Sequence, residues 1–541
     1  MILKFSKVFY SALAASFLFV GCGATSLIST PVENIDTVPL KITDLSDAQK
    51  KNWGHLDLLA DTIPGMSVDK AYKEIIKNRK GKKIIVAVLD SGMDLKHEDL
   101  DNVLWTNTKE IKGNGKDDDG NGYIDDIHGY NFLGTSYNEQ LEYTRILSLN
   151  LGDTSLQTKA KSELDKKHQE NLQNKQRYEE ILQAVKNADI AVQKELGKET
   201  YTKKDLTSIE TEDQAMQKNI SILMQMFTFA DSIPEVFEEL NSGISHFAES
   251  LNYNLNVDFN GRKEVGDNPY DFSDIGYGNG NPQSIGKDES HGTHVAGIIG
   301  AERNNGKGAN GVANNVAIMS IRAVPNGDEY DKDIALGIRY AVDNGAKIIN
   351  CSFGKSFSPN AQWVYDAIKY AASKDVLIVH AAGNDGADLD DPNNPNFPND
   401  QINNGAEISD NVITVGALDS KYGSEVLASY SNYGKINVDV FAPGTDIYST
   451  VPNNKYKAMP GTSMASPAVA GVAALIWSQY PNLNASQIKK IILQSGLSLK
   501  TPIILGGDTS KISSLDKIST SGKIVNAYNA LLLAEKISKG K

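Results

Sequence analysis

The chain has 541 residues, enough for two or three domains or for one large domain with insertions. Its hydrophobic content of 40% and its charged content of 23% are ordinary for a globular protein. The formal net charge of −14 argues against a nucleic-acid partner, because binding to nucleic acid requires a basic face.

The N-terminus has the pattern of an export signal. Lysines precede a short apolar run, residues 8–20, which is followed directly by Gly21 and Cys22. The run is too short to span a bilayer comfortably, so a cleaved signal is favoured over a membrane anchor. The pattern resembles a bacterial lipoprotein signal, which implies removal of residues 1–21 and lipidation of Cys22. The alternative is an ordinary signal peptide with a chance cysteine.

The region after Cys22 predicts a tether followed by the folded part of the chain. Residues 22–51 are rich in Thr, Ser, Pro and Asp, whereas residues 52–541 carry the strand and helix patterns. A lipid on Cys22 would hold the protein on a membrane of the cell envelope. It would also leave Cys351 without a disulfide partner, so we interpret Cys351 as a packed thiol.

The first strand pattern is the apolar, β-branched run of residues 83–89, which follows a short amphipathic helix pattern at residues 68–80. Such a run is typical of a strand buried on both faces of a parallel sheet. It ends in Asp90, at the carboxyl end of the strand, where sites gather in α/β proteins. The alternative is an Asp that only forms the turn before Ser-Gly.

An acidic segment follows at residues 114–126. Carboxylates and an amide alternate there, with glycines for the turn, which is the pattern of a calcium loop of the EF-hand type. The usual glutamate at the twelfth position is replaced by His128, so Asp125 or Asp126 would close the loop. A solvated acidic turn is the alternative. The candidate ligands are Asp117, Asp119, Asn121, Asp125 and Asp126.

Residues 134–265 differ from the rest of the chain. They are rich in Lys, Glu, Gln and Asn, with apolar residues at helical intervals around 178–192 and 216–226. The pattern predicts an α-helical insertion of two to four helices. It serves as a structural appendage, or as a lid or docking arm for a partner protein.

The α/β pattern resumes at His291, which opens a helix of small residues. The helix dipole disfavours a protonated imidazole at this end, which suits a general base. His294 shares its helix face, but the ligand spacing of a zinc helix is missing. Strand patterns then alternate with helices, which predicts an α/β fold with a doubly wound, mostly parallel sheet and helices on both faces. The strands are at 316–324, 347–353, 376–382 and 411–417, and the helices include 333–344 and 360–374.

Two further polar residues occupy positions that suit chemistry. Asn384 follows the strand at 376–382, and its amide can donate to an oxyanion; a plain turn Asn is the alternative. Ser463 begins a helix of small residues, where backbone N–H groups lack helical partners. A nucleophile that generates an oxyanion is well placed there.

Three motifs combine these signals. They are Val-Leu-Asp-Ser-Gly-Met-Asp around Asp90, His-Gly-Thr-His-Val-Ala-Gly from His291, and Gly-Thr-Ser-Met-Ala-Ser-Pro around Ser463. In this order they resemble the motifs of the subtilisin-like serine proteases, a family that also places an Asn in its oxyanion hole. The resemblance implies that Ser463 is the nucleophile, His291 the general base, Asp90 its orienting acid and Asn384 an oxyanion donor.

The resemblance also implies a substrate-binding edge and a second metal site. Protein or peptide substrates would add as a strand to Gly327, Ser352, Phe353 and Gly354, with Ala381, Ala382 and Gly383 lining the pocket before the cleaved bond. Asp328 and Glu329 suggest tolerance for basic side chains. Asp99 and Asn305 match the ligands of the family's tight calcium site. Catalysis needs no cofactor, and calcium is expected to be structural.

One feature departs from the family. The residues between Cys22 and the start of the domain are too few for a folded propeptide. Either the protein folds without one, or the helical insertion substitutes for it. The competing functional class is a non-catalytic binding protein on the same scaffold, although the four intact catalytic positions favour an enzyme.

Overall fold

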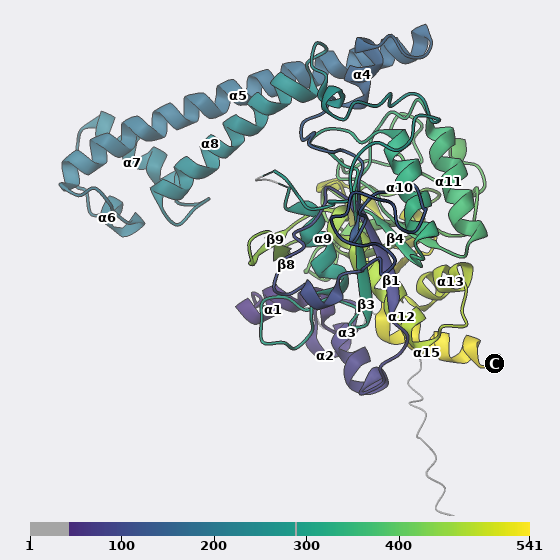
Figure 1. Ribbon diagram of the computed structural model, residues 1–541. Helices are drawn as coiled ribbons and strands as arrows, with labels where there is room; N and C mark the ends of the chain where they lie inside the picture. The colour runs from purple at the N-terminus through teal and green to yellow at the C-terminus, as the bar shows by residue number, and fades with distance from the viewer. Residues whose placement is uncertain (1–42, 287–288, 541) are drawn as a thin grey trace, which may run out of the picture.

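The computed structural model describes residues 43–286 and 289–540. The predicted signal peptide, the lipidation site Cys22 and most of the predicted tether lie outside these residues. The described chain forms an α/β body from which a helical arm projects (Figure 1).

A mostly parallel sheet forms the centre of the body. Among the described residues, nine strands pair in the order β10-β13-β7-β6-β5-β4-β1-β3-β2. All neighbours run parallel except β10 and β13, so the predicted sheet is confirmed. The strands are β1 Ile84–Asp90, β2 Gly129–Asn131, β3 Val316–Arg322, β4 Ile348–Cys351, β5 Leu377–Ala381, β6 Val412–Leu418, β7 Val440–Pro443, β10 Leu497–Ser498 and β13 Lys523–Ile524.

The strand order explains where a site forms. From β1 the chain adds β3 on one side, and it later returns to add β4 on the other side of β1. In such sheets the crossover connections diverge at the switch point, which opens a crevice at the carboxyl ends of the strands. Asp90 is the last residue of β1 and therefore lies at this edge of the sheet, beside the switch point.

Helices cover both faces of the sheet, as predicted. Successive residues of β1 point to opposite faces: Val86 and Val88 join one core cluster, and Ala87 and Leu89 join another. The first cluster includes residues of α9 His291–Gly300, α12 Thr462–Gln479, α13 Ala485–Ser495 and α15 Ala527–Ser538. The second includes residues of α10 Asp331–Asp343 and α11 Ala361–Ser373.

Short elements complete the body. The predicted helix at 68–80 is divided into α3 Val68–Ala71 and a π-helical turn, Tyr72–Ile76. The hairpins are β8 Ile447–Val451 with β9 Lys455–Met459, and β11 Ile503–Leu505 with β12 Asp508–Ser513. The remaining short helices are α2 Leu58–Asp61 and α14 Leu515–Ile518.

The folded part begins earlier than the sequence suggested. Residues 47–51, expected to be tether, belong to helix α1 Asp47–Asn52, which packs on β8. A capping box starts this helix: the Ser46 hydroxyl accepts the Gln49 N–H, and the Gln49 side chain accepts the Ser46 N–H. The polar composition of the segment concealed this signal.

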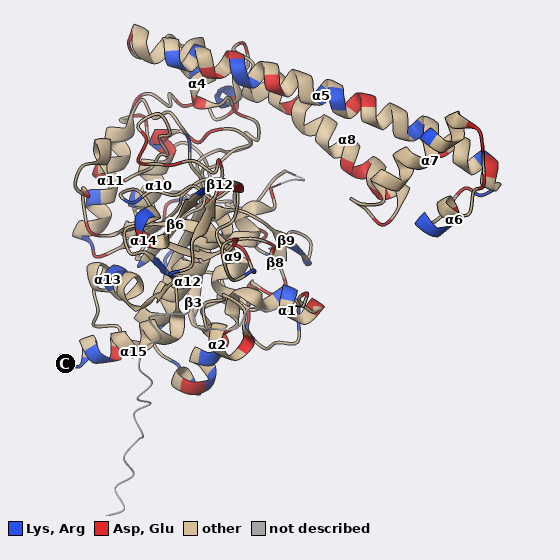
Figure 2. Cartoon of the chain, turned by 180° about the vertical axis from the view of Figure 1, so that it is seen from behind, with Lys and Arg blue, Asp and Glu red and all other residues tan. Residues whose placement is uncertain are grey.

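The insertion lies between β2 and α9 and is helical. Its helices are α4 Glu142–Ser148, α5 Thr154–Leu196, α6 Lys203–Thr207, α7 Gln214–Met226 and α8 Ile233–Glu249. Helix α5 packs along α7 and α8, and charged residues of both signs alternate along its length (Figures 1 and 2). Helix α8 lies within the predicted helical insertion, and its residues Ile233, Val236 and Leu240 are buried at helical spacing. The described part of the insertion has five α-helices, one more than the two to four predicted. None of the helices in the described ranges is both long and apolar enough to cross a bilayer.

Small residues let α9 pack closely on the hairpin β8–β9. A Cβ built at Gly297 would lie 2.2 Å from the Thr450 Oγ1 and 2.4 Å from the Ser449 Oγ. These hydroxyls donate to α9 carbonyl groups, those of Thr293 and His294, so they cannot move away without losing hydrogen bonds.

We expect Gly297→Ala to destabilise the protein by about 1–3 kcal/mol, because the added methyl group overpacks this contact. Denaturant unfolding measures the change. Lys369→Ala, at an exposed position of α11, is the control and should change stability by less than about 0.5 kcal/mol. Equal effects of the two substitutions would contradict the packing argument.

Candidate active site

Asp90 and His291 form a hydrogen-bonded pair at the carboxyl edge of the sheet. The His291 Nδ1 lies 2.8 Å from the Asp90 Oδ1, which also accepts the Ser91 N–H at 2.8 Å. The Asp90 side chain is 2% exposed, whereas the imidazole is 37% exposed. A Cβ at Gly292 would lie 2.1 Å from the Gly92 carbonyl oxygen, so only glycine allows α9 to begin this close to β1.

Two opposing effects set the pKa of His291. Burial alone would lower it, but the charge of Asp90 and the hydrogen bond to it raise the pKa above its ordinary value of 6.5. The carboxylate also fixes the orientation of the ring, which leaves Nε2 as the nitrogen available for proton transfer. The pair has the arrangement of a general base with its orienting acid.

Ser463 lies in the first turn of α12 and exchanges two hydrogen bonds with Ser352. The Ser463 hydroxyl donates to the Ser352 carbonyl at 3.0 Å, and the Ser352 hydroxyl donates to the Ser463 carbonyl at 2.8 Å. The second bond exists because Pro467, four residues on, has no N–H to donate to the Ser463 carbonyl. The nucleophile position is thereby tied to the segment that follows β4.

Asn384 is oriented by the residue before Ser463. Its Oδ1 accepts the backbone N–H of Thr462 at 2.9 Å and the Thr462 hydroxyl at 3.0 Å. The Thr462 Oγ1 in turn accepts the Gly383 N–H at 3.0 Å. Because the amide oxygen is occupied, the Asn384 Nδ2 remains as a donor beside the start of α12.

The predicted pocket residues come from two strand ends and are joined by Asn396. Ser352, Phe353 and Gly354 follow β4, and residues 381–383 end and follow β5. The Asn396 Nδ2 donates to the carbonyl groups of Ala381 and Ala382 at 3.2 and 3.1 Å. A Cβ at Gly354 would lie 2.3 Å from the Asn396 Oδ1. Asn396 was not predicted, because its role depends on a loop folding back between the two strand ends.

Comparison with known proteins agrees with this geometry. Residues 81–504 match the family described as the subtilase family. The chain is a subtilase. The predicted subtilisin-like fold class is thereby confirmed.

The chain is similar to several proteinases, and it spans about half the length of the first of them. The chain is 40% identical over 263 residues to a thermophilic serine proteinase of Bacillus sp. strain AK1, covering 48% of this chain and 55% of that protein. It is 39% identical over 210 residues to subtilisin DY of Bacillus licheniformis, covering 39% and 71%. It is 37% identical over 242 residues to thermitase of Thermoactinomyces vulgaris, covering 44% and 74%.

The acidic loop of this subtilase brings together only part of the predicted ligand set. Ligand atoms of Asp117, Asp119 and Glu110 lie within 4.8 Å of one another. Glu110 precedes the motif and was not predicted, because the loop folds back onto it. Its Oε1 accepts the N–H groups of Asp118 and Asp119, whereas its Oε2 is buried without a hydrogen-bond partner.

The other predicted ligands in this loop have different partners. Both Asp125 carboxylate oxygens accept backbone N–H groups of residues 113–115, so Asp125 stabilises the loop and does not close the cluster. Asp126 accepts hydrogen bonds from the side chains of Asn107, Asn121 and Tyr340. Among the described residues, the carboxylate that joins Asp117 and Asp119 in a cluster is Glu110, and neither Asp125 nor Asp126 belongs to it.

Asp99 and Asn305 meet, as the resemblance implied. The Asn305 Nδ2 donates to the Asp99 Oδ1 at 2.5 Å, and the Ala309 N–H donates to the Asp99 Oδ2 at 3.1 Å. The Asn305 Oδ1 accepts the Lys307 N–H, and the Lys307 Nζ donates to the Glu98 carbonyl. In the described part of the chain, Asp99 belongs to no cluster of three or more ionisable side chains that could hold a metal, and calcium at this position stays a prediction.

His294 and Cys351 are core residues. The His294 Nε2 donates to the Lys457 carbonyl at 3.0 Å, and burial lowers its pKa to about 4. Within the described ranges, neither His294 nor His291 belongs to a cluster that could hold a metal. Cys351 is fully buried, and its burial raises the pKa of the thiol, in agreement with a packed thiol.

We predict that Asp90→Asn lowers the pKa of His291 below 6.5, because burial remains while the opposing charge is lost. NMR titration of the imidazole signals measures this change.

In the wild type the pKa of His291 is raised, so protonated His291 stabilises the fold below pH 6.5. This contribution to stability disappears as pH rises through the folded-state pKa.

His294 and His380 provide internal controls for the same titration. Burial lowers the pKa of each to about 4, so their signals should stay unchanged between about pH 5.5 and 8. A wild-type pKa of His291 at or below 6.5 would contradict the role given to Asp90.

Proposed function

We propose that this subtilase hydrolyses peptide bonds in proteins or peptides through Asp90, His291 and Ser463. The observation that carries the proposal is the 2.8 Å hydrogen bond between a buried Asp90 and a half-exposed His291. It combines with a serine in the first turn of α12 and an oriented amide beside it. Both helix starts lie at the carboxyl edge of the sheet, where a substrate can reach them.

In the proposed reaction the Ser463 Oγ attacks the substrate carbonyl while the His291 Nε2 accepts the hydroxyl proton. Asp90 stabilises the imidazolium that forms, and His291 then gives the proton to the leaving amine. The resulting acyl-enzyme is hydrolysed by water through the same base. To react, the Ser463 hydroxyl must leave the Ser352 carbonyl, its acceptor in the resting site.

The negative charge of the tetrahedral intermediate would be held by the Asn384 Nδ2 and the Ser463 N–H. Asn384 is pre-oriented because its Oδ1 is fixed by Thr462. Loss of one such donor typically reduces kcat by about 10²–10³. Substrate would lie extended between Gly327 and residues 352–354, with residues 381–383 around the side chain before the cleaved bond.

The proposed location is the cell envelope, with a lipid on Cys22 as the anchor. The support is the sequence pattern of residues 1–22 alone. Docking of a partner protein on the helical insertion likewise stays a prediction.

We predict that Ser463→Ala abolishes peptide hydrolysis and covalent labelling by a fluorophosphonate, because the only acyl-accepting oxygen is removed. Melting temperature should be unchanged. Ser478→Ala, in the same helix and buried, is the matched control and should keep both activities. Labelling that survives Ser463→Ala would refute the assignment, and a wild type without labelling or hydrolysis would favour the non-catalytic binding protein.

We further propose that calcium binds at Glu110, Asp117 and Asp119. Three carboxylates supply hard oxygen ligands, and the Glu110 Oε2, buried with no hydrogen-bond partner, fits a missing cation. Glu110 is 8% exposed, and a buried carboxylate oxygen without a partner is costly. The ion would join the loop to the chain after β1 and act on stability.

We predict that calcium raises the melting temperature of the wild type by several degrees, since saturation at 100 times Kd stabilises by about 2.7 kcal/mol. Glu110→Gln keeps the shape of the side chain but should abolish this response. Glu179→Gln, at an exposed position of α5, is the control and should retain it. A calcium response of wild-type size in Glu110→Gln would exclude this site.

A further inference from the structure

The first residues of the insertion form backbone hydrogen bonds with residues 326–328, which belong to the expected substrate-binding edge. The Asn326 N–H donates to the Tyr137 carbonyl at 2.8 Å, and the Glu139 N–H donates to the Asn326 carbonyl at 3.0 Å. The Asp328 N–H donates to the Gln140 carbonyl at 3.3 Å. Gly327 packs against the same segment, since a Cβ at this position would lie 2.2 Å from the Glu139 carbonyl oxygen.

Arg145 of α4 holds the next residues of this edge. Its side chain is 1% exposed, and its guanidinium lies 3.9 Å from the centre of the Tyr330 ring. Nη1 donates to the Asp328 carbonyl at 2.7 Å, and Nη2 donates to the Glu329 carbonyl at 3.0 Å. Nη1 also donates to the Gln140 carbonyl. One buried side chain therefore fixes carbonyl groups on both the insertion and the edge.

Lys355 extends this network to the other side of the expected cleft. It follows Gly354, and its side chain is 2% exposed. Its Nζ lies 2.7 Å from the Glu142 carboxylate, 2.8 Å from the Asp331 carboxylate and 2.8 Å from the Glu329 carbonyl. The Glu142 carboxylate of α4 also accepts a hydrogen bond from the Arg145 Nη2 at 2.5 Å. One carboxylate of the insertion therefore pairs with both buried cations.

The charged side chains at this edge interact mainly with other residues of the protein. Burial would raise the pKa of Glu142, but Arg145 and Lys355 lower it below its ordinary value, so the carboxylate is ionised at neutral pH. Asp328 accepts the Glu142 N–H, and Glu329 is 2% exposed with its pKa raised by burial to about 8. Glu329 is therefore not offered to a substrate, and one oxygen of Asp328 already accepts a hydrogen bond, which weakens the basis for the expected tolerance of basic side chains.

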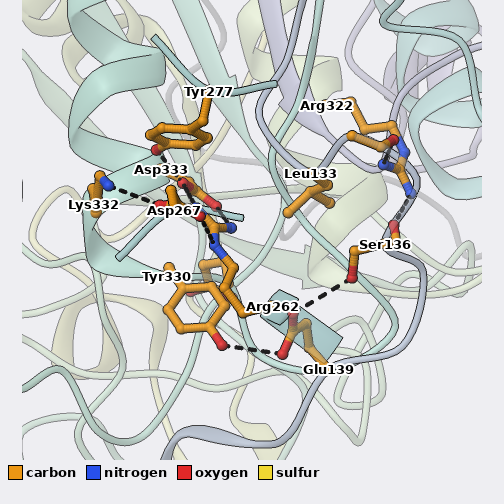
Figure 3. A network of polar contacts seen from close by, with 12 residues as sticks. Leu133, Ser136, Glu139, Arg262, Asp267, Tyr277, Arg322, Tyr330, Lys332 and Asp333 are labelled. Atoms are coloured by element: carbon orange, nitrogen blue, oxygen red, sulfur yellow. Dashed lines mark hydrogen bonds and ion pairs between the residues drawn. The ribbon is translucent and has the colours of Figure 1, made fainter. Parts of the chain in front are cut away.

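The other end of the insertion is tied to the same region. Arg262 pairs with Asp267 and with Asp333 of α10, and Lys332 also contacts Asp267 (Figure 3). Figure 3 shows the Tyr330 hydroxyl donating to Glu139 beside this network. Both ends of the insertion thus pack against residues 326–333.

The distal arm is separate from these contacts. The buried residues of its core lie between Leu182 and Leu240, and none of them belongs to a core cluster of the body. A smaller cluster near α4 holds Leu164 and Leu255. Asn254 also belongs with the contacts at the base, because its Nδ2 donates to the carbonyl groups of Glu139 and Asn326 at 2.8 and 3.0 Å. The insertion therefore has a root, which we define as residues 134–150 and 254–267, and an arm between them.

We infer that Glu142 and Arg145 in the root are positioning residues for the substrate-binding edge. They fix the separation between residues 326–331 and residues 352–354. At this separation an extended peptide can pair with both segments. The arm plays no part in this. The inference rests on the proposed peptidase function, and it assigns the root, but not the arm, to the recognition of extended substrates.

The test compares two substrates. A tetrapeptide amide is long enough to pair with Gly327, whereas a single-residue acyl ester is too short to reach it. In Glu142→Gln we expect KM for the tetrapeptide to rise about tenfold, because each backbone hydrogen bond lost contributes a few-fold. The kcat/KM of the ester and the rate of fluorophosphonate labelling should stay within about twofold. Glu179→Gln on α5 is the matched control and should change neither substrate.

Arg145→Lys is the second variant, because it keeps the charge but loses the bidentate contacts. It should raise KM for the tetrapeptide in the same selective way even if Glu142→Gln does not fold. Replacing residues 179–246 by a short glycine-serine turn, between the contacting rings of Tyr178 and Phe247, should leave KM within about twofold.

Three outcomes would overturn the inference while the peptidase function stands. They are an unchanged tetrapeptide KM in both root variants, an equal loss for the ester and the tetrapeptide, or a tenfold rise in KM on removing the arm. By contrast, a wild type that fluorophosphonate does not label would refute the peptidase function itself.

Discussion

The site depends on how closely two helices approach the carboxyl edge of the sheet. Helix α9 begins against the turn after β1 because Gly292 has no side chain to meet the Gly92 carbonyl oxygen, and this approach puts His291 on Asp90. Helix α12 begins beside Asn384 and Ser352, with Thr462 and Ser463 each bonded to one of them. These backbone contacts therefore set the geometry of the site, and they determine where its polar side chains lie.

Hydrogen bonding also links the catalytic positions to the substrate edge. Ser463 and Ser352 exchange two hydrogen bonds because Pro467 leaves one carbonyl of α12 free. Lys355, three residues after Ser352, reaches the root of the insertion. A continuous set of contacts thus runs from Ser463, the proposed nucleophile, through residues 352–355 to α4.

The sequence predicted the features that local patterns encode. Runs of β-branched residues identified the central strands, and motif order led to the proposed set Asp90, His291 and Ser463, with Asn384 added by the resemblance. It did not predict Glu110, Asn396 or Arg145, whose partners depend on how distant loops fold back. A count along an EF-hand pattern selected Asp125 and Asp126, but the carboxylate that clusters with Asp117 and Asp119 is Glu110, from an earlier part of the chain. The helices of the insertion were predicted as a group from their apolar spacing, but α8 was not delimited as a separate helix.

The burial of Cys351 has a practical consequence. It is the single cysteine among the described residues, and it lies in β4 at the centre of the sheet, between β1 and β5. The body needs no oxidising compartment to fold, and reducing agents leave its structure intact. A thiol reagent can reach Cys351 only when β4 separates from its neighbours, so the alkylation rate of this residue reports how often the central sheet opens.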